Sequence, residues 1–255
     1  MLIVVAGAML SAASHAQDRP FLYTMTFPDH RVQPLVIHYD AAYGRETFEP
    51  FGADRVEQAI GLQTGVSEFV SLDAHMGLAL DGRSSRTSQQ AELFAHVLKA
   101  DDHLIDLSAG AGVRHEYSGT NVLLARIVAG RRFSSWQIYG NLLLEKAMSR
   151  ERDDIDLITT FGLSYHVSTA IRFGIEAVGQ DLEGFWDENE AEGGATLFLG
   201  PAIGYMIPET PWSLTVGGGV IMHASKSIRT TDATRDLPLG KQNGFVIRTM
   251  LSFSL

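Results

Sequence analysis

The sequence contains no cysteine, so neither a disulfide framework nor a thiolate metal site is available to it. It also lacks any run of about 18 apolar residues, the length that a membrane-spanning helix requires. Its 20 Lys and Arg are outnumbered by 30 Asp and Glu, which gives a net charge of −10. This balance argues against a nucleic-acid partner, which would call for a basic patch.

What remains is a chain of average polarity. Charged residues make up 20% of it, its mean hydropathy is +0.03, and glycine occurs 25 times. A membrane β-barrel has such averages because only alternate residues of each strand meet lipid. The composition is therefore compatible with a membrane barrel.

One continuous apolar run occupies residues 2–13 and is followed by Ser14, His15 and Ala16. Its length and its small-x-small ending are typical of a signal peptide, although no Lys or Arg precedes it. A buried N-terminal helix or strand is the alternative. The predicted organisation is a signal peptide over residues 1–16, an N-terminal periplasmic extension over 17–32 and a β-barrel over 33–255.

Strict two-residue alternation marks the end of the chain. Over residues 245–255 one face carries Phe245, Ile247, Thr249, Leu251, Phe253 and Leu255. The same pattern recurs over residues 104–116, 155–167 and 171–180. Soluble strands usually have five or six residues, whereas membrane strands need about nine to eleven. The lengths favour a barrel in a membrane.

Counted along the chain, the alternating segments predict 12 strands, an even number as bacterial single-chain barrels require. Ten is the alternative, because the first strand carries Pro34. Short connections, such as 100–102 and 208–210, alternate with long ones, such as 183–193 and 225–242. Bacterial outer-membrane barrels have short turns on the periplasmic side and long loops on the external side. An even number of strands then places both termini in the periplasm.

These features resemble Gram-negative outer-membrane β-barrel proteins over about residues 33–255. The ending departs from the usual terminal Phe, since Leu255 is last and Phe253 stands two residues before it. The resemblance implies an all-β, transmembrane, antiparallel up-and-down barrel in the bacterial outer membrane. Its expected partners are outer-membrane lipid, lipopolysaccharide and the barrel-insertion machinery; no cofactor is expected, and the oligomeric state stays open.

Two sets of side chains follow from this register. Aromatic rings at the ends of strands near the short turns are expected at the lipid–water boundary: Phe69, Trp136, Tyr165, Tyr205, Trp212 and Phe253. Charged residues of both signs are expected to line the lumen: Asp73, His75, Glu92, His96, Asp106, Arg114, Glu116, Arg126, Arg132, Glu145, Asp156, His166, Arg172, Glu176 and Arg248.

The inward charges have two interpretations. They form either an electrostatic network that fills a narrow barrel or the wall of a water-filled passage selective for small polar solutes. Inward glycines, among them Gly174 and Gly217, leave volume that favours a passage, or they ease strand curvature.

Candidates for chemistry are few. His223 and Ser225 lie two residues apart on one strand face, where a base can activate a hydroxyl. Their spacing resembles that of outer-membrane lipid hydrolases, but the predicted register points the pair inward. Asp187, Glu188 and Glu190 are weak candidates for a hard cation such as calcium, in a loop without EF-hand spacing.

We therefore expect a narrow passive channel or transporter for small polar solutes. The first alternative is a closed structural or interaction barrel that displays loops 183–193 and 225–242. The second alternative is an outer-membrane lipid hydrolase that uses His223 and Ser225.

Overall fold

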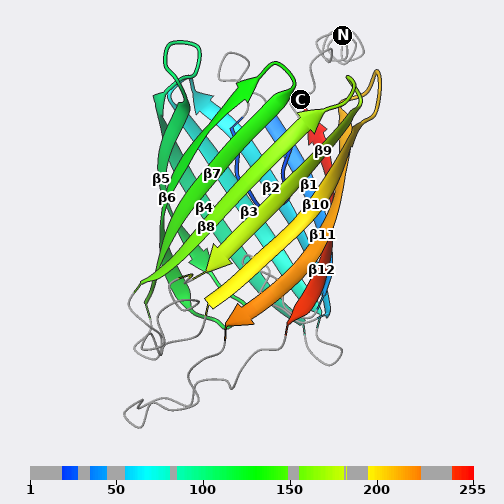
Figure 1. The fold of residues 1–255 in the computed structure, drawn as a ribbon. Helices are drawn as coiled ribbons and strands as arrows, with labels where there is room; N and C mark the ends of the chain where they lie inside the picture. Colours follow the sequence, from blue (N-terminus) through cyan, green and yellow to red (C-terminus); the bar gives the residue numbers. More distant parts are fainter. Residues whose placement is uncertain are drawn as a thin grey trace, which may run out of the picture.

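The computed structural model describes residues 19–27, 35–44, 55–80, 85–148, 155–180, 182, 195–224 and 243–255. Twelve antiparallel strands form one closed up-and-down barrel (Figure 1). This confirms the predicted fold class, with 12 strands and not ten. The strands are β1 (Leu35–Gly44), β2 (Arg55–Ser67), β3 (Val70–Leu80), β4 (Ser85–Leu98), β5 (Asp106–His115), β6 (Asn121–Phe133), β7 (Trp136–Ala147), β8 (Asp156–His166), β9 (Ile171–Gln180), β10 (Ala195–Met206), β11 (Trp212–Ala224) and β12 (Gly244–Ser254).

The terminal strand closes the barrel. β12 pairs with β1 in an antiparallel register that runs from Val36↔Ser254 to Gly44↔Val246. Each other strand pairs with its neighbours in sequence. Closure removes the unpaired edges that would otherwise expose backbone N–H and C=O groups.

The two ends of the barrel differ. The connections β2–β3, β4–β5, β6–β7, β8–β9 and β10–β11 lie at the end that also holds the C-terminus (Figure 1). We call this the short-turn end and the opposite one the long-loop end. The predicted long loops 183–193 and 225–242 lie outside the described residues.

Apolar side chains cover the outer face of the sheet. On β6, Ile127 is 47% exposed while its neighbour Val128 points inward and is 2% exposed. The same alternation continues around the barrel, with Leu142, Phe161, Ile175 and Ile203 on the outside. A continuous apolar belt of this kind is stable where lipid covers it. No helix in the described part of the chain has the length and apolarity to cross a membrane.

Aromatic rings gather at the short-turn end of this belt. Trp136 packs on Tyr165 with ring centroids 4.6 Å apart, and Trp212 packs on Phe253 at 4.7 Å. Phe69 and Tyr205 are exposed at the same end. The structure thus places the six predicted boundary aromatics in one zone of the outer face, while their role at a lipid boundary stays a prediction.

The belt leads to a stability prediction. Ile127 lies at the middle of β6 on the outer face, so an Ile127→Arg substitution places a charge at the centre of the belt. We expect the free energy of unfolding in lipid vesicles to fall by about 2–4 kcal/mol. Leu123→Arg, on the same face but near the long-loop end, should cost less than about 1 kcal/mol. Equal losses in urea titrations of the two variants would show that the belt does not sit in a bilayer.

Candidate functional site in the barrel interior

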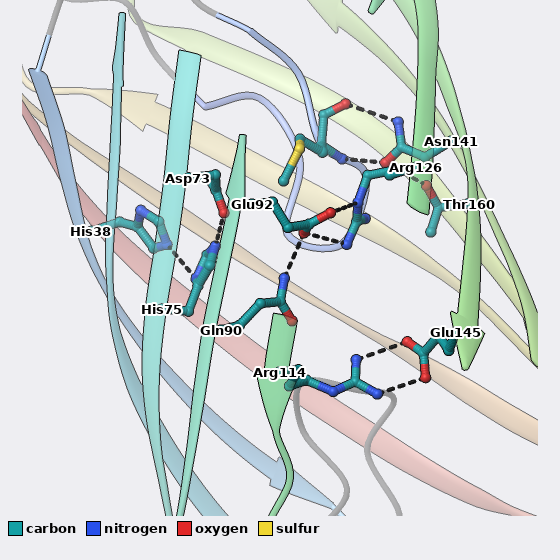
Figure 2. Close-up of polar contacts among 11 residues, drawn as sticks. His38, Asp73, His75, Gln90, Glu92, Arg114, Arg126, Asn141, Glu145 and Thr160 are labelled. Atoms are coloured by element: carbon teal, nitrogen blue, oxygen red, sulfur yellow. Dashed lines mark hydrogen bonds and ion pairs between the residues drawn. The ribbon is translucent and has the colours of Figure 1, made fainter. Parts of the chain in front are cut away.

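Ion pairs between strands cross the inward face. Glu92 on β4 accepts two hydrogen bonds from Arg126 on β6, from Nε at 3.0 Å and Nη2 at 2.9 Å. Arg114 on β5 donates to both carboxylate oxygens of Glu145 on β7, at 2.7 and 2.6 Å (Figure 2), and to Glu116 at 2.9 Å. Forked pairs of this kind satisfy buried charges, and each of these two links strands that are separated by one strand of the wall.

A second polar cluster lies on β1, β3 and β12. Asp40 accepts a hydrogen bond from Nε of Arg248 at 3.0 Å. His75 contacts Asp73, and Nε2 of His38 lies 3.4 Å from Nδ1 of His75 (Figure 2). Asp73, His75 and Arg248 are predicted lumen residues, whereas His38 and Asp40 were not predicted. The two-residue alternation over residues 36–42 places both His38 and Asp40 on the inward face of β1.

The other predicted lumen residues also lie on inward strand positions. His96 stands between Ser71 and Ser108, with N–O distances of 2.6 and 2.8 Å. Asp106 accepts the N–H of Ala100 at 2.7 Å. His166 lies 3.1 Å from the side-chain nitrogen of Gln137. Asp156 is partly buried at the start of β8, and Arg132 is exposed towards the barrel mouth.

Apolar side chains form an inward layer towards the long-loop end, which sequence reasoning did not predict. It is a buried cluster contributed by many strands of the wall: Ala42, Ala59, Val122, Leu124, Leu143, Ile158, Val178, Phe198, Ile221 and Val246. The ring of Tyr23 packs against this layer, with its centroid 4.7 Å from that of Phe198.

Residues 19–27, which we call the internal segment, lie inside the barrel (Figure 1). The segment starts near the short-turn end, where Arg19 donates to His38 at 3.0 Å. It reaches deepest at Tyr23 and returns to Phe27, which packs on Phe94 and His96. The sequence predicts a periplasmic extension over residues 17–32. The described part of that stretch instead buries Phe21, Leu22 and Met25 in the lumen.

Glu176 binds the deepest part of the internal segment. Its carboxylate accepts the consecutive main-chain N–H groups of Leu22, Tyr23 and Thr24, at 2.7, 2.8 and 3.0 Å. Successive N–H groups that converge in this way form a concave anion-binding site. The predicted lumen carboxylate on β9 is thereby the main anchor of the segment.

Amide and guanidinium groups of the wall hold the rest of the segment. Asn141 accepts the N–H of Met25 at 2.7 Å and donates to its C=O at 3.1 Å (Figure 2). Gln63 donates to the C=O of Thr26 at 2.9 Å, and Arg172 donates to the C=O of Arg19 at 2.9 Å. Main-chain groups of Arg19 and of residues 22–26 therefore have partners on the wall.

Two glycines of the wall provide room for the segment. A Cβ at Gly162 would lie 2.7 Å from the ring of Phe21, and one at Gly217 would lie 2.7 Å from Leu22. Both contacts are shorter than real Cβ contacts allow. Of the two interpretations of Gly217, unfilled volume and eased strand curvature, the first is wrong here, because Leu22 occupies that volume.

A cavity of about 600 Å³ remains at the short-turn end. The internal segment forms its floor through Phe27, and Asp106, Arg132 and Tyr139 contribute to its wall. Both signs of charge line it, since Lys99 and Arg131 face it together with Asp101 and Asp102. We call this cavity the vestibule.

The candidates for chemistry do not converge. His223 lies at an inward position of β11, where its Nδ1 is 3.1 Å from the hydroxyl of Thr196. Ser225, Asp187, Glu188 and Glu190 lie outside the described residues. Within the described ranges no group of three or more His, Asp or Glu side chains is arranged to hold a metal ion.

A closed antiparallel barrel with an apolar outer belt and a charged interior defines an outer-membrane β-barrel protein. No family model and no curated protein matches the chain.

Solved structures of similar fold are outer-membrane porins and channels. The NanC porin has 10% sequence identity and a TM-score of 0.59, with 86% of this chain and 100% of that chain covered. The KdgM porin in complex with disordered oligogalacturonate has 10% identity and a TM-score of 0.58, covering 86% and 99%. An outer-membrane channel from Pseudomonas putida F1 has 9% identity and a TM-score of 0.53, covering 88% and 95%. At these identities the likeness shows a shared fold.

Proposed function

We propose that this protein is an outer-membrane channel for small polar solutes and that the internal segment controls its conductance. One observation carries the proposal: chain residues 19–27, and not side chains of the wall alone, fill the centre of the barrel. Displacing the segment therefore opens space lined by Asp40, Asn141, Glu176 and Arg248. The porins of the same fold support this assignment.

The orientation of the barrel belongs to the proposal. The C-terminus shares one end with the connections β2–β3, β4–β5, β6–β7, β8–β9 and β10–β11. Barrels of this class keep their short turns in the periplasm. The internal segment then enters from the periplasmic side, and the vestibule opens to the periplasm. We further propose that the barrel has no lipid-hydrolase activity, because His223 faces the interior whereas lipid lies outside.

A closed structural barrel is the second candidate, and one observation favours it. Phe21, Leu22 and Thr24 are at most 1% exposed, so the segment leaves little room beside itself in this conformation. A barrel whose segment never leaves would serve only to display its loops.

Single-channel recording in planar bilayers separates the two candidates. The intact protein should show brief, infrequent openings, because the segment is held by many hydrogen bonds. Replacing residues 19–27 with a Gly/Ser sequence of equal length should produce a steady current. The replacement keeps the chain length and the strand sequences, so folding is checked by the gel mobility of unheated protein. A folded replacement variant without stepwise current would establish the closed structural barrel.

A further inference from the structure

The lumen wall recognises the main chain of the internal segment more completely than its side chains. The N–H groups of Leu22, Tyr23 and Thr24 bind Glu176, and both main-chain groups of Met25 bind Asn141. By contrast, the buried hydroxyls of Tyr23 and Thr24 have no hydrogen-bond partner among the described residues. A wall shaped for these particular side chains would have paired those hydroxyls, because an unmade buried hydrogen bond is costly.

Arg19 donates to His38, but the apolar side chains of the segment enter recesses that select by size and not by polar groups. Phe21 stands over Gly162 with Tyr139 beside it, and Leu22 stands over Gly217. Phe27 packs on the ring of Phe94 at 4.7 Å. Main-chain hydrogen bonds combined with apolar recesses are the general way in which proteins bind peptides of varied sequence.

From this division of contacts we infer that the lumen is a peptide-binding passage, in which the internal segment occupies the place of a short apolar peptide. The inference rests on the proposed channel function and adds to its small polar solutes a second ligand class, short peptides with a polar main chain and apolar side chains. Asn141 offers an acceptor and a donor to one residue, as a neighbouring strand would, and Glu176 offers a carboxylate to consecutive N–H groups. A sugar or an inorganic ion presents no such repeated pattern of N–H and C=O groups.

The test uses the variant whose residues 19–27 are replaced by Gly/Ser, which empties the apolar recesses and leaves the replaced segment without apolar side chains to hold it in the lumen. The probe is a synthetic peptide of residues 21–25, acetylated and amidated, added on the short-turn side of a planar bilayer. We expect it to block the current in a saturable way, while a neutral trisaccharide of similar size does not. The intact protein, whose site is occupied, should bind the labelled peptide at least tenfold more weakly.

A matched pair of substitutions locates the site. Asn141→Leu removes both contacts to Met25 and should weaken the peptide block about tenfold, since two hydrogen bonds of ordinary strength are lost. Gln137→Leu removes another buried amide from the inward face of β7, whose partner is His166 and not the segment. It should leave the block unchanged.

Equal block by the trisaccharide, or equal effects of the two substitutions, would overturn the peptide inference and leave the channel intact. Absence of current in the replacement variant would instead overturn the channel. In that case fluorescence anisotropy with labelled peptide and detergent-purified barrel decides the binding question by itself. Saturable binding that Asn141→Leu weakens supports a peptide site, and no binding rejects it.

Discussion

Oxidation of a Phe21→Cys/Gly162→Cys variant is expected to abolish single-channel openings, and reduction is expected to restore them. The ring carbon Cγ of Phe21 lies 3.0 Å from the position of a Cβ at residue 162. Since Cβ of residue 21 is one further bond of about 1.5 Å away, the two Cβ atoms lie within about 4.5 Å, which a disulfide can span. A covalent link there ties the internal segment to β8.

The absence of native cysteine makes this experiment unambiguous. A disulfide in the variant joins the two introduced thiols. Each single-cysteine variant serves as a control, because it cannot form the disulfide that ties the internal segment to β8. The measurement is open probability before and after oxidation, followed by addition of a reductant. If the oxidised double variant still opens as often as the reduced one, solutes pass without movement of the segment, and gating by residues 19–27 is excluded.

The strands were predictable because alternation is a local property of the sequence. Residues 245–255 predicted a terminal strand, and β12 covers Gly244–Ser254. The inward direction of Glu92, Arg114 and Arg126 followed from parity alone. The odd or even position of a residue gives its direction but does not predict which charges pair. Arg114 pairs with Glu145, which lies two strands away across the curved interior and not on an adjacent strand.

The internal segment was not predictable in the same way. Its partners Asn141 and Glu176 lie more than a hundred residues further along the chain, and no local pattern links them. One signal was present all the same. Phe21, Leu22 and Tyr23 form an apolar stretch with Met25 and Phe27 in a region expected to extend into water. Such a stretch gains free energy from burial, and the lumen provides the place for it.

Glu176→Gln should raise the ratio of open to closed channel about a hundredfold. The carboxylate accepts three main-chain N–H groups, whereas the glutamine amide presents one oxygen and an NH2 group that opposes them. Hydrogen bonds to a charged acceptor are worth about 1.5–3 kcal/mol each. A net loss of about 3 kcal/mol from the plugged state corresponds to two powers of ten in the equilibrium.

Glu92→Gln is the matched control for that prediction. Glu92 is also a buried carboxylate, at 1% exposure, but it binds Arg126 and Gln90 and not the internal segment. It should loosen the wall without raising the open probability comparably. Equal increases in both variants would attribute opening to a softened barrel. The decisive arrangement places Glu176→Gln in the Phe21→Cys/Gly162→Cys background, because oxidation then suppresses the added openings only if they arise from release of the segment.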